Sequence, residues 1–274
     1  MNRSISFAGL VAALALAGAS AAPAANLVTN GGFESNNLPA GQSAEIGSGN
    51  SYTSGYDATG WTSNGYNLLW YVPNATTQTA ISQYPGEPQI LDAAFTPEAN
   101  NGNGAYVMGL DSDAQYGGPL SQVISGLTVG KTYVLSFDWA GVQLTNRSGP
   151  TTDNVFACLT IQACTLSYNS LNYGATASVA NGQSTGTVDI ASQGFSGWQK
   201  QTFTFKADST SETLTFLAFG TPGGEPPFSL IDNVSLTAAP EPATWAMMLL
   251  GFGGLGALAR RRRGAGAVEQ GFAS

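Results

Sequence analysis

The reactive side chains present limit the chemistry open to this chain. None of its 274 residues is histidine, so Ser-His-Asp and Cys-His catalysis and the ordinary histidine zinc sites are excluded. Glycoside hydrolysis stays open, because it needs only one carboxylic acid and one carboxylate. The available aspartates are Asp92, Asp111, Asp138 and Asp153, but the sequence gives no distance between them. We therefore assign no catalytic residue.

Aromatic side chains cluster early in the chain, at Tyr66, Trp70 and Tyr71. Aromatic faces can stack on the apolar patches of sugar rings, so these three residues are candidate sugar contacts. The alternative is that they pack in the interior, since Trp and Tyr usually bury much of their surface. Trp61, in the sequence Gly60-Trp61-Thr62, is expected in the core.

The N-terminus has the three parts of a secretory signal peptide. Arg3 is followed by an apolar run over residues 7–19. Two stretches then fit a cleavage site with small residues at its first and third positions, Ala19-Ser20-Ala21 and Ala22-Pro23-Ala24. The run is too short for a confident membrane span. We expect residues 1–25 to be removed and the mature chain to begin near Asn26.

The C-terminus combines a chain break, an apolar segment and a basic cluster. After Pro240-Glu241-Pro242, residues 244–259 carry no charge, and Arg260, Arg261, Arg262 and Arg263 follow. As a helix, sixteen residues reach only ~24 Å, and snorkelling arginines could cover the rest of a ~30 Å hydrocarbon core. The positive-inside rule would keep the arginines cytoplasmic and the middle region outside. Residues 264–274 are expected to form a short disordered tail.

This segment resembles the PEP-CTERM sorting signal in its PEPxxWA variant, through Pro240, Glu241, Pro242, Trp245 and Ala246 and the later arginines. The resemblance covers residues 240–263. It implies recognition by an exosortase, a membrane-embedded enzyme of Gram-negative bacteria that export polysaccharide. Cleavage near Pro240 would then release the protein or attach it at the cell surface. The additional residues after Arg263 depart from the usual pattern, which leaves processing open.

Residues 26–239 form the expected mature region, whose length suits one all-β domain. It contains fifteen acidic residues and four basic ones, Lys131, Arg147, Lys200 and Lys206. Such a surface repels phosphates, which argues against a nucleic-acid partner. Cys158 and Cys164 lie in an exported chain, where a disulfide forms readily, although two free thiols remain the alternative. On a straight strand they would be ~20 Å apart, so a disulfide requires a turn near residues 160–162.

Alternation of apolar and polar residues predicts strands rather than helices in this region. It is clearest over 131–140, and recurs at 202–205 and 213–218. Further strands are expected at 105–110, 120–125 and 229–236, separated by glycine-containing breaks. Many short strands with turns between them argue for a β-sandwich or jelly roll.

The order of short motifs resembles jelly-roll carbohydrate-binding modules of the galactose-binding-like group. These motifs are Asn30-Gly31-Gly32-Phe33-Glu34, Gly60-Trp61-Thr62, the stretches 120–127 and 130–137, and Ile231-Asp232-Asn233-Val234. The resemblance runs through nearly the whole mature chain. It implies a jelly-roll β-sandwich more strongly than it implies any ligand, because such folds host many functions.

The same resemblance implies a structural Ca²⁺ that joins the first and last strands through Glu34 and Asp232. Carboxylates and carbonyls are suitable Ca²⁺ ligands, and a carbonyl near Lys131 is a possible third contributor. The alternative is that Glu34 pairs with Lys131 in solvent. Asp111 and Asp113 flank Ser112 as a second cation-loop candidate, for which a solvated turn is the favoured interpretation.

Together these features predict a non-catalytic, exported surface or extracellular-matrix protein that binds polysaccharide. The alternatives are a structural or adhesive matrix protein without a small ligand and, less favoured, a glycoside hydrolase.

Overall fold

The computed structural model describes the middle region of the chain in detail. The described residues are 24–47, 55–82, 89–97, 104–113, 115–165, 167–168, 177–178, 180, 182–225, 227–240, 252 and 254. The signal peptide before residue 24, the sorting motif from residue 241 onward and the tail 264–274 lie outside these residues. Of the predicted hydrophobic helix, only Phe252 and Gly254 are described, and both are helical. Among the described residues, no helix is long and apolar enough to cross a membrane.

Strands dominate the described part, as the alternating sequence predicts. The elements are β1 (Ala44–Ile46), β2 (Thr62–Ser63), β3 (Asn67–Tyr71), the 3-10 helix η1 (Val72–Asn74), β4 (Tyr106–Asp111), β5 (Leu120–Ser125), β6 (Thr132–Val142), β7 (Thr151–Thr160), β8 (Ser167–Tyr168), β9 (Ala177–Ser178), β10 (Gln183–Ser184), β11 (Val188–Ile190), β12 (Gln199–Lys206), β13 (Ser211–Thr221) and β14 (Phe228–Ala238). The expected strands at 105–110, 120–125, 131–140 and 229–236 correspond to β4, β5, β6 and β14.

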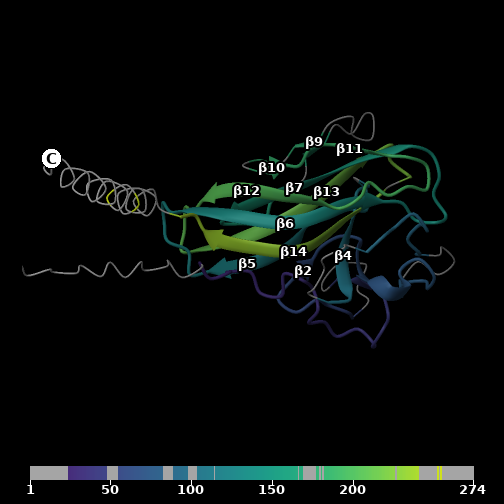
Figure 1. The fold of residues 1–274 in the computed structure, drawn as a ribbon, viewed down its shortest axis with the longest axis horizontal. Helices are drawn as coiled ribbons and strands as arrows, with labels where there is room; N and C mark the ends of the chain where they lie inside the picture. The colour runs from purple at the N-terminus through teal and green to yellow at the C-terminus, as the bar shows by residue number, and fades with distance from the viewer. Residues whose placement is uncertain are drawn as a thin grey trace, which may run out of the picture.

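Two antiparallel sheets pack face to face (Figure 1). The first has the order β1-β3-β4-β14-β6-β12 and is called the β14 sheet below. The second, the β13 sheet, has the order β10-β7-β13-β5-β2, with β11 also paired to β7. The orders β4-β14-β6-β12 and β5-β13-β7-β11 are those of a jelly roll, an eight-stranded double sheet. The predicted jelly-roll sandwich is confirmed.

The core lies between the two sheets and follows from the strict alternation of β6. Leu135, Phe137 and Trp139 point inward and are almost fully buried, whereas the intervening side chains point to the outer face. Phe137 meets Phe216 of the opposite sheet edge to face, with ring centroids 5.1 Å apart. Trp61 is also buried here, as expected, and its indole donates to the Asn30 carbonyl at 3.0 Å.

A second apolar cluster covers one half of the outer face of the β14 sheet. Loop residues such as Leu91 and Phe95 pack there on Trp70, Val142 and Leu230. The other half carries the outward side chains of β12, β6 and β14, which are mostly Ser and Thr, and no described element of this cluster covers them.

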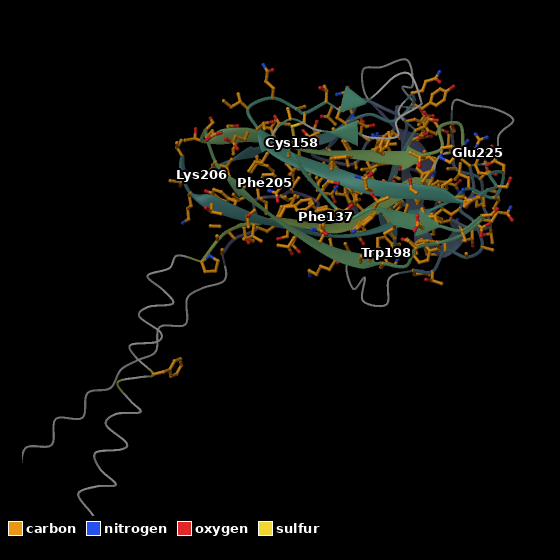
Figure 2. The ribbon with its side chains drawn as sticks, turned by 90° about the horizontal axis from the view of Figure 1, so that it is seen from above. Phe137, Cys158, Trp198, Phe205, Lys206 and Glu225 are labelled. Atoms are coloured by element: carbon orange, nitrogen blue, oxygen red, sulfur yellow. A yellow bond between two sulfur atoms is a disulfide. The ribbon has the colours of Figure 1, made fainter. Side chains whose placement is uncertain are left out.

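The first and last segments of the sandwich domain lie side by side at one end of the fold. The Leu27 amide donates to Leu236, and the Ala239 amide donates to Thr132, at 2.9 Å in each case. Because β14 ends at Ala238, the predicted sorting motif begins two residues after the last described strand. Figure 2 shows Lys206 near this end and Glu225 at the opposite end.

Candidate functional site

Two of the three predicted sugar contacts are interior residues. Tyr66 is 5% exposed and Trp70 is fully buried. Both rings lie against Phe228, with centroids 6.3 and 6.2 Å away, and the Tyr66 hydroxyl lies 2.8 Å from Ser82 Oγ. The prediction that these faces stack on sugar is therefore wrong for Tyr66 and Trp70. Their burial follows from β3 lying under the second apolar cluster.

The third candidate, Tyr71, is half-buried at the end of β3. It pairs across the strands with Tyr106, and the two ring centroids lie 5.3 Å apart at 55°. Gly41 packs near the edge of its ring. Tyr71 stays a predicted sugar contact, but it lies apart from the polar groups described next.

A row of three charged residues crosses the outer face of the β14 sheet. Lys200 of β12 lies opposite Asp138 of β6, and Asp138 lies opposite Asp232 of β14. Directly opposed side chains in an antiparallel pair have Cβ atoms about 5 Å apart. Asp138 is 9% exposed and Asp232 3%, whereas Lys200 is exposed. The sheet thus brings two aspartates 94 positions apart in sequence next to one cationic side chain.

Trp198 borders this row on the side of the apolar cluster. It comes two residues before Lys200, so the two side chains share the outer face and their Cα atoms are about 7 Å apart. Its indole N–H donates to the Thr96 carbonyl at 3.0 Å, and its ring meets Phe195 at 6.3 Å, nearly perpendicular. These contacts hold the half-buried ring in one orientation. Figure 2 places Trp198 on the side of the sandwich opposite Cys158.

Trp198, Lys200 and Asp138, with Asp232 beside them, form what is called here the outer-face site. One fixed aromatic ring next to a few convergent polar groups is the composition of a small-molecule or sugar site. Neither Trp198 nor Lys200 was among the site residues predicted from the sequence. The spacing of the residues could have revealed them. Trp198 and Lys200 lie at even positions, like the exposed Thr202 and Thr204, whereas the core residues Phe203 and Phe205 lie at odd positions.

The predicted calcium ligands Glu34 and Asp232 lie on the first segment and on the last described strand, and both approach the start of β4. Glu34 Oε1 accepts from the Tyr106 amide at 2.8 Å. Asp232 Oδ1 accepts from the Asn233 amide at 2.7 Å. Because Ile231 pairs with Met108 in the antiparallel sheet, Asp232 lies near Val107, the residue next to Tyr106. Two carboxylates from these segments fit the donor chemistry of Ca²⁺.

Lys131 does not complete such a calcium site. It lies seven residues from Asp138 along the chain, or roughly 23 Å along the strand, and Asp138 is the neighbour of Asp232. Its carbonyl accepts from the Ala207 amide at 3.0 Å. Within the described residues, no three His, Cys, Asp or Glu side chains gather to hold a metal ion.

The two aspartates at the end of β4 are buried and do not lie in a solvated turn. Asp111 and Asp113 are 4% and 3% exposed. Asp111 Oδ1 accepts from the Asp113 amide, and Asp113 Oδ2 accepts from the Gly224 amide, both at 2.7 Å. Burial raises the pKa of Asp111 well above its usual value, and the Asp113 amide partly offsets this. The carboxylates replace missing backbone partners in a tight turn, so the solvated-turn interpretation was wrong.

Cys158 and Cys164 form a disulfide on the outer face of the β13 sheet, with Cα atoms 6.6 Å apart. The chain bends at residues 161–162, where the sequence required a turn. Both cysteines pack with Phe156, Leu217 and Phe219.

Comparison with known proteins identifies the C-terminal segment. Residues 238–263 match the PEP-CTERM protein-sorting motif. The chain therefore carries a signal that marks an exported, cell-surface protein, as its sequence predicted. The match begins at Ala238, the last residue of β14.

Similarity elsewhere is more distant. Halomucin of Haloquadratum walsbyi is 27% identical over 233 residues, which are 85% of this chain but only 2% of that protein. Among solved structures, TmCBM61 in complex with β-1,4-galactotriose is 14% identical with a TM-score of 0.35, over 78% of this chain and 99% of that one. The CBM22-1 xylan-binding domain of Paenibacillus barcinonensis Xyn10C is 11% identical with a TM-score of 0.35, over 81% and 99% of the two chains.

Proposed function

We propose that this protein is a non-catalytic polysaccharide-binding module, exported and sorted to the cell surface by an exosortase of a Gram-negative bacterium. The observation that carries the proposal is the outer-face site, where a fixed Trp198 ring borders Asp138 and Lys200. The ring would stack on one sugar residue, while the carboxylate accepts from its hydroxyls and Lys200 donates to its oxygens. The sorting motif supports the location, because such a protein meets polysaccharide outside the cell.

Glycan binding by the mature protein tests the proposal most directly. Polysaccharides, including those of the producing organism, would be screened by affinity electrophoresis with the wild type and with Trp198→Ala. We expect the substitution to weaken binding at least about tenfold, as for a central aromatic contact. Trp198→Phe controls for lost packing against Phe195. Tyr116→Ala changes an aromatic residue that is 39% exposed and outside the site, and should leave binding unchanged.

The result that contradicts the proposal is absence of binding to every polysaccharide, or equal binding by wild type and Trp198→Ala. If Tyr71→Ala abolishes binding and Trp198→Ala does not, the sugar contact lies at the Tyr71–Tyr106 pair. No binding at all would favour a structural or adhesive matrix protein.

Hydrolysis is a second candidate function, because Asp138 and Asp232 lie directly opposite each other. Retaining glycosidases hold two carboxyl groups about 5 Å apart, on the two sides of the scissile bond. Here the two side chains are 9% and 3% exposed, which leaves little room for a sugar between them. Release of reducing ends, abolished by Asp138→Asn, would establish the hydrolase instead.

A further inference from the structure

The end of the sandwich from which the sorting tail leaves is built from two turns. One turn covers residues 128–131 and the other 207–210, and they are joined by Gly130 N–H to Ala207 and Ala207 N–H to Lys131, at 2.7 and 3.0 Å. The Ala239 amide is held at the start of β6, next to the first turn, by its bond to Thr132. These two turns with Ala239 are called the tail-exit end.

The chain length beyond the fold limits how far this end can lie from a membrane. The apolar run begins at Thr244, five residues after Ala239. Five residues span at most ~17 Å when fully extended. The headgroup layer on each side of the hydrocarbon core is itself about 5–8 Å thick. A tail inserted in a bilayer therefore holds the tail-exit end at or just above the headgroups.

The surface near this end has the side chains that suit such a position. Among the described residues of the sandwich, three large apolar side chains are more than half exposed: Val123 at 67%, Val129 at 59% and Ile161 at 68%. Val129 lies on the first turn. Val123 and Ile161 lie near the same end of the β13 sheet, because Val123 and Thr160 share one row across Thr213.

The charges at this end also differ from those of the rest of the domain. Two of the four basic residues between 26 and 239, Lys131 and Lys206, lie here, and Gly130 packs near the end of the Lys206 side chain. Asp208 on the second turn is the opposing exposed acid. In the rest of the domain acidic residues predominate. An anionic surface would therefore repel the rest of the domain more strongly than the tail-exit end.

We infer that the tail-exit end rests on the membrane surface while the tail is attached, with Val129 and Ile161 among the headgroups and Lys206 near lipid phosphates. The occupant of this surface is a bilayer containing anionic lipid. The domain would stand upright, with Glu225 at the far end. This inference does not depend on sugar binding.

The full-length chain in vesicles of phosphatidylcholine and phosphatidylglycerol tests the orientation. Val129→Cys and Glu225→Cys would each carry an environment-sensitive fluorophore, since Cys158 and Cys164 are already paired. We expect blue-shifted emission and quenching by headgroup-labelled lipid at position 129, and water-like, unquenched emission at position 225. Lys206→Glu combined with Ile161→Asp should reduce quenching at position 129 by at least about half.

Flotation of the vesicles reports tail insertion separately from domain contact. Protein that floats while position 129 gives water-like emission overturns the inference and leaves the anchor intact. Protein that does not float also overturns it, because the end is then not held at a bilayer. Equal quenching at positions 129 and 225 would mean that the domain lies on its side, which contradicts the upright orientation.

Discussion

Asp153 of β7 accepts a hydrogen bond from the Ser112 hydroxyl at 2.8 Å, which links the two sheets at the end opposite the tail. Asp153 is fully buried, and no donor among the described residues reaches its Oδ2. That oxygen would lie 3.2 Å from a Cβ at Gly141. Burial raises the pKa of Asp153 to about 7, although hydrogen bonds from Ser112 and Ser229 lower it.

This pKa predicts that Asp153 destabilises the fold as the pH rises. The folded state binds more protons than the unfolded state between about pH 4 and pH 7, so the contribution of Asp153 is most favourable below pH 4. A shift of about three units corresponds to roughly 4 kcal/mol lost by pH 7 and above. Chemical denaturation of Asp153→Asn across pH 4–8 should give a stability that falls less with pH than that of the wild type. Asp189→Asn, at an exposed position, controls for the charge, and identical pH profiles for wild type and Asp153→Asn would contradict the prediction.

Gly31 is required by the contact between the first segment and β14. The Val234 amide donates to the Gly31 carbonyl at 2.9 Å, and a Cβ at position 31 would lie 2.0 Å from the Val234 carbonyl oxygen. Backbone on both sides cannot yield easily, so we expect Gly31→Ala to lower the free energy of unfolding by about 3 kcal/mol. Gly186→Ala is the matched control, because nothing lies within 4 Å of a Cβ there. Equal denaturation midpoints for the two variants would contradict the prediction, because the first segment could then move away from β14 without a loss of stability.

Removal of the disulfide should lower stability by about 2 kcal/mol, since it closes a short loop. Replacing both Cys158 and Cys164 by Ala keeps the cluster with Phe156 apolar. The measurement is thermal unfolding of the double variant beside wild type, with and without reductant. Reductant should move the wild type toward the variant and leave the variant unchanged. If the variant is as stable as oxidised wild type, the disulfide does not contribute to stability, and local packing alone maintains the bend at residues 161–162.

Calcium binding at Glu34 and Asp232 remains a proposal with a direct test. We expect millimolar Ca²⁺ to raise the Tm of the mature protein and a chelator to lower it, because an ion bound only to the folded state stabilises that state. Glu34→Gln should remove the Ca²⁺ response, whereas Asp189→Asn should keep it. A Tm that neither calcium nor chelator moves would mean that direct hydrogen bonds, such as Leu27 to Leu236, suffice to join the chain ends.

The sequence predicted the strands that alternate cleanly and missed those that do not. The run from Tyr133 to Trp139 has one buried face, so its period of two is visible. In β7, residues 153–159 are buried on both faces, and the outward Phe156 and Cys158 pack with Cys164, Leu217 and Phe219, so the alternation disappears. Short strands such as β10 and β11 are defined by their partner β7 and have no periodicity of their own.

The sites were predicted less well, for a similar reason. Tyr66 and Trp70 had the right chemistry, but whether a ring is covered depends on loops that fold over the sheet from distant parts of the chain. Asp138 and Asp232 become neighbours only through the pairing of β6 with β14. No local pattern contains that register, whereas the sorting motif is read as a linear sequence and was therefore identified in full.

The position of β14 has a consequence for the timing of export. Without this strand, β1-β3-β4 and β6-β12 are two separate ribbons, because β14 alone joins β4 to β6 in the sheet. It is also the last of the described strands along the chain. The sheet can close only once the chain is available as far as residue 238, where the match to the sorting motif begins. In an exported chain, the β14 sheet is therefore completed only after almost the whole described sandwich has crossed the membrane.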